Sequence, residues 1–149
     1  LYRDARIMNI YEGTSQLQVV AAINGITKGT FMEQIARYAE AEYCDAVKPA
    51  VEKLAALTER VKAMVERVET INRDFPAYKD FHARRLVESV GYIVMTYLLA
   101  RQSGEAAEYV SDTRLMLKMT EAYIAAAETY IANSEGSDVA LINEVGEQY

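Results

Sequence analysis

The stretch that decides the fold is residues 105–133, EAAEYVSDTRLMLKMTEAYIAAAETYIAN. Large apolar residues recur in it every seven positions, in two neighbouring series. The two series are Val110, Leu117, Ile124 and Ile131, and Met116, Tyr123 and Tyr130. Such a heptad pattern is typical of a long helix that packs nearly antiparallel against its neighbours at a small crossing angle. The stretch therefore predicts one long helix of a helical bundle.

Two more segments have helical periodicity. Residues 49–72 place apolar side chains three and four positions apart and charged ones on the other faces, which predicts an amphipathic helix. Pro49 suits the first turn of that helix and disfavours helical geometry at Lys48. Residues 76–103 predict a further long helix that we expect to be the most enclosed, because its second half is apolar almost all round. We expect Gly104 to end it as a left-handed cap.

The fold class follows from these helices and the one before them. Thr30 and Glu33 have the spacing of a capping box, which predicts a helix that starts at residue 30 and fades near Asp45. No segment alternates strictly between apolar and polar residues, so we expect no strands. Residues 30–133 thus predict an all-α, up-and-down four-helix bundle. A loop at 133–137 and one short helix at 138–145 are expected to follow.

Composition excludes several classes of function. The 149 residues hold 16 Lys and Arg against 22 Asp and Glu, a net charge of −6. This balance argues against a nucleic-acid partner, which needs a basic surface, and makes contact with an anionic membrane unlikely to be favourable. Cys44 is the single cysteine, which excludes an internal disulfide and favours a reducing, cytoplasmic compartment. The longest apolar stretch, residues 91–100, is about half as long as a membrane span requires.

The segment at residues 2–18, YRDARIMNIYEGTSQLQ, differs from the rest of the chain. Its short helical stretch is interrupted at Glu12 and Gly13, and a new helix is expected from Thr14 or Ser15. Glu12 would thus lie on a tight loop just before a helix N-terminus, where a desolvated carboxylate could act as a base. From these residues alone, a plain turn is the commoner interpretation.

The same segment resembles a known family. Residues 3–6, RDAR, followed by residues 10–18, IYEGTSQLQ, closely resemble the signature near the C-terminal end of acyl-CoA dehydrogenases. A subset of that family carries an additional helical domain after this point, and residues 26–149 look like that extension. One departure is Val19, because many relatives place Arg after the final Gln of the motif. It puts in doubt any ionic contact from that position and leaves Glu12 untouched.

The resemblance implies a FAD-dependent oxidoreductase that converts acyl-CoA thioesters into trans-2-enoyl-CoA. In the family the glutamate of the motif, here Glu12, is the base that removes the α-proton of the substrate, and the β-hydrogen leaves as hydride to FAD. By position, Tyr11 and Gly13 would contact the substrate. The residues that would contact FAD are Thr14, Ser15 and Gln16. The implied partners are an acyl-CoA substrate, an electron-transfer acceptor protein and further copies of the chain in a homo-oligomer.

The domain organisation follows from the resemblance. We expect residues 1–28 to be the end of the catalytic helical domain, a severed active-site helix-loop-helix segment, and residues 29–149 to be a C-terminal helical-bundle extension. The chain then looks cut from a longer flavoprotein, and we expect it to be inactive alone, with residues 1–28 fraying or packing on another copy. The alternative is a non-enzymatic helical interaction or oligomerisation module. Packing on the catalytic body is the favoured role of the extension.

Other chemistry-bearing residues have ordinary structural explanations. His82 is the single histidine and has no partner at metal-ligand spacing, so no metal site is expected. Arg84 and Arg85 could hold a phosphate, but solvated or ion-paired side chains are the preferred interpretation. Cys44 has no evident base beside it and is expected to be inert. Carboxylates and tyrosines on helix faces are interpreted as solvated charge and core packing: Glu40, Glu42 and Asp45, and Tyr38, Tyr97, Tyr123 and Tyr130.

Overall fold

The structure is a computed structural model that describes residues 15–141 of the chain. Within that range it is all α-helical. The long elements are α2 (Ser15–Thr27), α3 (Thr30–Ala39), α4 (Lys48–Asn72), α5 (Tyr78–Gln102) and α6 (Glu108–Ala132). Residues 138–141 are also helical, so a short helix does begin after the predicted loop. None of the helices in residues 15–141 combines the length and apolar character that crossing a bilayer requires.

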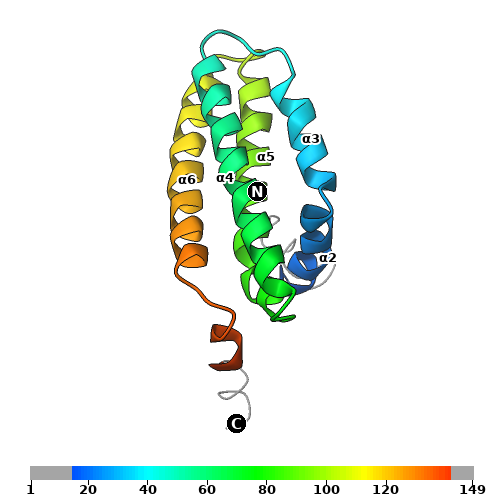
Figure 1. Cartoon of the computed structure of the whole chain (residues 1–149). Helices are drawn as coiled ribbons and strands as arrows, with labels where there is room; N and C mark the ends of the chain where they lie inside the picture. Colours follow the sequence, from blue (N-terminus) through cyan, green and yellow to red (C-terminus); the bar gives the residue numbers. More distant parts are fainter. Residues whose placement is uncertain (1–14, 142–149) are drawn as a thin grey trace.

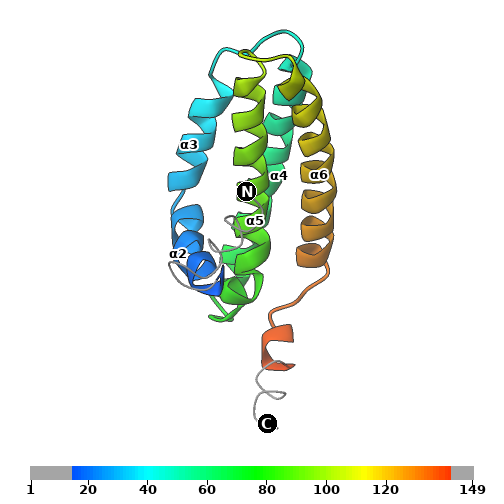
Figure 2. The same ribbon diagram turned by 180° about the vertical axis from the view of Figure 1, so that it is seen from behind.

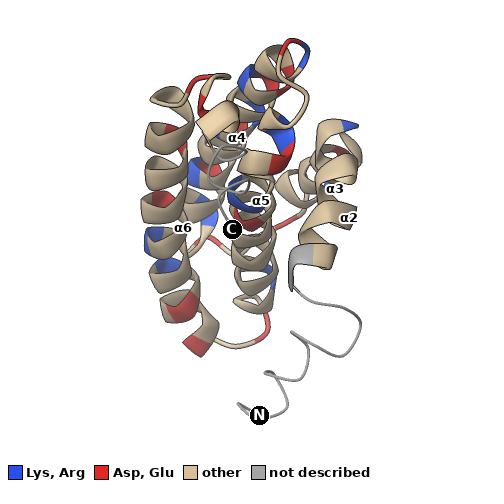
Figure 3. Ribbon diagram, turned by 90° about the horizontal axis from the view of Figure 1, so that it is seen from below, with Lys and Arg blue, Asp and Glu red and all other residues tan. Residues whose placement is uncertain are grey.

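The helices form an up-and-down bundle (Figure 1). α2 and α3 run in the same direction, one after the other, and make the first arm. α4, α5 and α6 then alternate in direction, and the chain leaves the bundle below α6 (Figures 1 and 2). Seen from below, α6 and the α2–α3 arm lie on opposite sides of the α4–α5 pair (Figure 3). The predicted fold class is therefore confirmed, with α2 as an additional part of the bundle.

The first arm is broken at Gly29, which has a φ of 84°. This left-handed conformation is open to glycine and costly for other residues, so the chain can leave α2 and re-enter a helix at once. The predicted capping box at Thr30 is wrong, because Gly29 is the N-cap of α3 and no side chain caps it. Phe31 then folds back across the break onto Gly25, where an added Cβ would lie 2.6 Å from a ring carbon.

α5 is the central helix, because each of the other long helices packs against it. Its largest side chains are removed from solvent, with Leu86, Ile93 and Tyr97 all 0% exposed. The prediction that this helix is enclosed by the others is thus confirmed for three of its sides. Its fourth side is open, since Met95 and Leu98 are 47% and 42% exposed.

α2 is fastened to the bundle through an apolar face that packs on α5. Ile23 and Ile26 of that face are 1% and 2% exposed, and Val19 is 8% exposed. Burying such side chains contributes roughly 1.5–3 kcal/mol each, which offsets the entropy cost of ordering a short helix. The expectation that residues 1–28 fray or need a second copy is therefore wrong for residues 17–27. The division of the chain at residue 28 stays a prediction.

Hydroxyl groups of α5 and α6 meet in two pairs between the helices. The hydroxyls of Thr96 and Thr120 are 2.9 Å apart, and those of Ser103 and Thr113 are 3.1 Å apart. All four residues are buried. Three of these hydroxyls also bond to carbonyls four residues earlier in their own helices, so they keep a partner if one helix slides along the other. The Thr113 hydroxyl would lose its partner, which costs about 1–3 kcal/mol.

The ends of two helices differ slightly from expectation. Lys48 is the first residue of α4, with Pro49 in the opening turn, so the proline does not exclude Lys48 from the helix. α5 ends at Gln102 and its C-cap Ser103 is right-handed. Gly104 supplies no left-handed cap, because Gly29 is the one glycine with positive φ in the described part of the chain. Instead, the Ser103 hydroxyl bonds back to the Leu99 carbonyl at 3.1 Å.

Replacement of Gly29 by alanine tests the break in the first arm. Because a Cβ is strained at φ 84°, Gly29→Ala should lower the free energy of unfolding by about 1 kcal/mol. Gly91→Ala is the matched control, since no atom lies within 4 Å of an added Cβ there and the site is inside α5. Thermal unfolding followed by circular dichroism should show a lower Tm for the first variant alone. An equal or higher Tm for Gly29→Ala would contradict this account of the break.

Candidate functional site

The residues that the motif singles out fall at the edge of the described structure. The predicted base Glu12, with Tyr11, Gly13 and Thr14, lies outside the described residues. Ser15 is the first residue of α2, and Gln16 is the second. The first described residue is therefore helical, in agreement with the helix that the sequence predicts from Thr14 or Ser15.

The start of α2 has the character that an anionic ligand needs. The first backbone N–H groups of a helix have no partner inside the helix and carry a partial positive charge. No acidic residue lies in the first turn of α2, so no carboxylate of that turn competes for these groups. Helix N-termini of this kind can receive an anionic group. The packing of α2 on α5 ties this end to a rigid body.

A second group of polar residues was not predicted. Where α6 ends, Ser134 lies between two side chains of α5 that are 0% exposed. Its Oγ is 2.7 Å from the Tyr78 hydroxyl and 2.9 Å from Nε2 of His82. Sequence patterns do not reveal this cluster, because 52 positions separate His82 from Ser134.

The hydrogen bonds of Ser134 settle the protonation of His82. The Ser134 hydroxyl carries one proton, and the Ile131 carbonyl lies 3.2 Å away as an acceptor. His82 Nδ1 has no hydrogen-bond partner. Because an unpaired acceptor is tolerated in a protein interior better than an unpaired N–H, we assign the proton to Nε2, which donates to Ser134. Burial lowers the pKa of His82 to about 4, and the charge of Arg85 acts in the same direction.

The cluster cannot act as a serine–histidine catalytic pair. A serine nucleophile needs an accessible hydroxyl and a base that a third group orients. Ser134, His82 and Tyr78 are all buried, and no group contacts Nδ1 of His82. The Ser134 oxygen already bonds to its neighbours. The arrangement instead holds the segment after α6 against the start of α5, as expected for a structural histidine.

Arginines of α4 and α5 complete this end of the bundle. Arg67 of α4 donates to the Ile131 and Ala132 carbonyls, both at 3.2 Å, and so satisfies two unpaired carbonyls at the end of α6. The guanidinium of Arg85 lies 3.6 Å from the ring centroid of Tyr130, a cation–π contact. Arg84 pairs with Glu88 at 2.8 Å. The two adjacent arginines are therefore engaged within the chain, as the preferred interpretation predicts.

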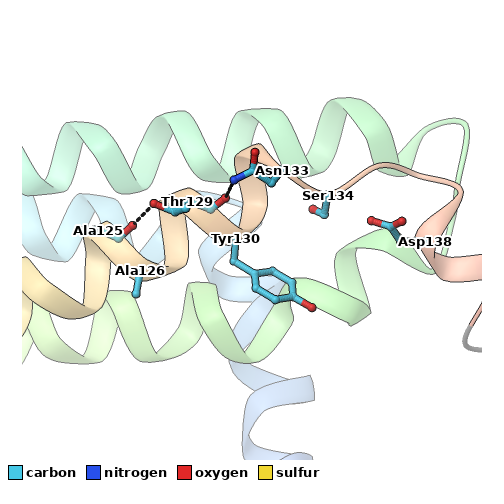
Figure 4. A pocket seen from close by; sticks show the side chains of 7 residues that line it. All are labelled: Ala125, Ala126, Thr129, Tyr130, Asn133, Ser134 and Asp138. Atoms are coloured by element: carbon cyan, nitrogen blue, oxygen red, sulfur yellow. Dashed lines mark hydrogen bonds between the residues drawn. The ribbon is translucent and has the colours of Figure 1, made fainter.

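A surface pocket of about 670 Å³ opens beside this cluster (Figure 4). Its lining residues are Ala125, Ala126, Thr129, Tyr130, Asn133, Ser134 and Asp138. The Asn133 amide donates to the Thr129 carbonyl at 2.8 Å, and the Asp138 carboxylate accepts from the Glu135 N–H at 2.8 Å. The polar groups of the pocket are thus committed to local bonds. It offers a mostly apolar surface and no reactive side chain.

The remaining candidate residues have ordinary structural surroundings, but core packing is wrong for Tyr130, which is 47% exposed. Cys44 donates a weak hydrogen bond to the Ser103 carbonyl, with 3.6 Å between sulfur and oxygen. Asp45 pairs with Lys48 at 2.6 Å on the surface. No group of His, Cys, Asp and Glu residues that could hold a metal ion occurs among the described residues. Tyr97 packs in the core, stacked on Tyr38 with 6.2 Å between ring centroids.

Comparison with known proteins decides the family. Residues 27–139 match the family described as "Acyl-CoA dehydrogenase C terminal". The chain belongs to this family. It is also similar to a solved structure, the crystal structure of the acyl-CoA dehydrogenase family protein from Porphyromonas gingivalis, with a TM-score of 0.70 and 28% identity. That similarity covers 77% of this chain and 98% of the solved chain. No curated protein matches the chain.

The family assignment confirms the acyl-CoA dehydrogenase family that the sequence resembles, on residues other than those of the motif at 3–18. The family match starts at residue 27, after the motif, so the two observations come from different parts of the chain. This C-terminal acyl-CoA dehydrogenase domain is the helical bundle that follows the motif.

The burial of His82 predicts that the stability of the folded chain depends on pH. His82 takes up a proton at about pH 4 in the folded chain and near 6.5 when unfolded, so the unfolded state binds more protons between these values. Stability should therefore fall as the pH falls through this window, by about 3 kcal/mol in total. Urea unfolding at a series of pH values measures this change in the free energy of unfolding. In the His82→Phe variant the free energy of unfolding should change little with pH above the range in which carboxylates titrate. An unchanged pH profile in that variant would contradict the role of His82.

Proposed function

We propose that this chain supplies the catalytic base of a FAD-dependent acyl-CoA dehydrogenase, with Glu12 as that base. The observation that carries the proposal is the position of the IYEGTSQLQ motif at residues 10–18, directly before a domain of the acyl-CoA dehydrogenase C-terminal family. A chance motif would have no reason to stand at that junction. In this proposal the chain is the C-terminal part of the enzyme and is inactive alone.

The chemistry explains why a glutamate is required on this turn. The α-proton of a thioester is too weakly acidic for a carboxylate in water, so a polarised carbonyl and exclusion of solvent are needed. Glu12 takes the α-proton on its carboxylate, and its backbone N–H together with a cofactor hydroxyl binds the thioester carbonyl. Tyr11 lines the acyl pocket, and Gly13 allows the substrate to approach the backbone closely.

The cofactor side of the site uses the start of α2. FAD, when bound, accepts the β-hydrogen as hydride, which yields the trans-2-enoyl-CoA. Thr14, Ser15 and Gln16 contact FAD in this proposal, and the first turn of α2 offers N–H groups without an acidic competitor. An electron-transfer protein would be the partner that accepts the electrons from the enzyme. The bundle of α2–α6 serves to hold this turn in place.

Substitution of Glu12 in the complete polypeptide that contains these residues tests the proposal. Glu12→Gln should retain FAD, seen by its visible absorbance, and should lower acyl-CoA-dependent reduction of an artificial electron acceptor by about 10²–10⁴-fold, the contribution of a positioned base. The matched control is Glu66→Gln, an exposed glutamate on α4 that should leave turnover unchanged. Unchanged turnover in Glu12→Gln would refute the role of Glu12.

A second candidate is a non-enzymatic helical oligomerisation module. A single measurement on the complete polypeptide distinguishes the two functions. Bound flavin with acyl-CoA turnover supports the dehydrogenase, and a flavin-free protein that exchanges no α-protons of an acyl-CoA supports the module.

A further inference from the structure

A small pocket opens between α3 and α4, and α5 is seen between these two helices in Figure 1. Its volume is about 200 Å³. The lining comes from residues 32–40 on the α3 side, from residues 55–62 of α4 and from Tyr97 of α5, and we call it the Tyr97 pocket. An apolar cavity of about 150 Å³ can hold benzene, so a molecule slightly larger than benzene fits here.

Tyr97 forms the base of the pocket. It projects from α5, whereas the other lining residues belong to α3, to its C-cap or to α4. Its ring packs near the rings of Tyr38 and Tyr43, with centroids 6.2 and 6.4 Å away. The hydroxyl is the atom of a tyrosine that lies farthest from its own helix, so it reaches toward the α3–α4 side. It comes close to the side chain of Thr58, which also lines the pocket.

The hydroxyl of Tyr97 is buried and has no hydrogen-bond partner. Burial raises the pKa of Tyr97, and the nearby Thr58 side chain acts in the opposite direction, so the hydroxyl keeps its proton at neutral pH and can donate it. Thr58 gives its own proton to the Leu54 carbonyl at 2.8 Å and makes no hydrogen bond with Tyr97. Since a buried hydroxyl without a partner is rare and costly, the base of the pocket lacks a hydrogen-bond acceptor.

The rest of the pocket indicates which kind of molecule could bring that acceptor. Much of the lining is apolar, as with Ile35 of α3 and Ala55 of α4. Among the charged lining residues, Lys62 pairs with Glu59 at 2.7 Å, and the exposed Glu40 adds a negative charge. These charges and the apolar lining disfavour a carboxylate or a phosphate. A neutral molecule with an apolar body and one carbonyl oxygen matches the lining and the unpaired hydroxyl.

We propose that the Tyr97 pocket binds a compact, neutral carbonyl compound. Its oxygen accepts a hydrogen bond from the Tyr97 hydroxyl, and its apolar body lies against Ile35 and Ala55. The bound molecule thus supplies the partner that the hydroxyl lacks. Met32 and Lys62 of the lining are half-buried, unbranched side chains, so they can move enough to admit the molecule to the base. The inference depends on the bundle and not on the chemistry proposed for Glu12.

A matched set of probes tests the proposal on the 149-residue chain. Acetophenone is neutral and carries one carbonyl, α-methylstyrene has a CH₂ group in place of the oxygen, and benzoate has the same size with a negative charge. Titrations followed by the amide chemical shifts in NMR spectra measure the three affinities. Acetophenone should bind about tenfold more tightly than α-methylstyrene, the effect of one hydrogen bond. Benzoate should bind more weakly than acetophenone.

Removal of the hydroxyl tests the base of the pocket. Tyr97→Phe should abolish the preference for acetophenone and leave the affinity for α-methylstyrene unchanged. The same variant should unfold at an equal or higher temperature, because it removes a buried, unpaired hydroxyl. Tyr92→Phe is the matched control, since Tyr92 is a half-buried tyrosine of α5 that stacks on Tyr123 and lies outside the lining. It should keep the preference.

Filling of the pocket tests its location. Ala55→Leu should lower the affinity for acetophenone on the order of tenfold, because the larger side chain occupies the space of the ligand. Ala56→Leu is the matched control, an exposed alanine of α4 outside the lining, and should bind as the unchanged chain does. An unchanged chain that binds no acetophenone would overturn the proposal and leave the hydroxyl to water. A preference for acetophenone that survives Tyr97→Phe, or binding that survives Ala55→Leu, would overturn it as well.

Discussion

The burial of α5 is the constraint on which the rest of the structure depends. Each of the other long helices packs against it, and its side chains Leu86, Ile93 and Tyr97 are closed off from solvent. A short helix such as α2 is marginal alone in water and is stable here because Ile23 and Ile26 are buried against this central helix. The bundle therefore orders the helix that carries the last residues of the motif, which is the link between fold and proposed chemistry.

Most polar groups inside the bundle are hydrogen-bonded, as is usual for buried polar groups. The hydroxyls of Thr96, Thr120 and Ser103 bond to carbonyls of their own helices and also meet hydroxyls of the neighbouring helix. These contacts let polar side chains lie between α5 and α6 without an unsatisfied group. At the lower end, His82 engages Ser134 and so fixes where the chain leaves α6. The single histidine of the chain thus contributes to the fold and takes no part in the proposed reaction.

Periodicity predicted α4, α5 and α6 within about three residues at each end because burial of one face repeats along each helix. The expectation that the helix from residue 30 reaches Asp45 is wrong, since α3 ends at Ala39. The start of α3 at Thr30 was predicted, but the capping box was the wrong reason for it, since the chain turns on an αL glycine at position 29. The Ser134–His82 contact was out of reach, because it depends on how the ends of two helices meet in space. For the candidate site, the start of α2 at Ser15 agrees with the sequence. The role of Glu12 rests on the resemblance, because spacing alone does not distinguish a catalytic turn from an ordinary one.

The central claim is that the motif-bearing helix α2 and the bundle form one rigid unit. Hydrogen–deuterium exchange of the chain, followed by mass spectrometry at increasing denaturant, tests this most directly. If the claim holds, amides of residues 19–27 are protected and lose protection together with those of α5, in one cooperative opening. If residues 19–27 exchange as an unstructured peptide while α5 stays protected, α2 is not held by the bundle and the account is contradicted.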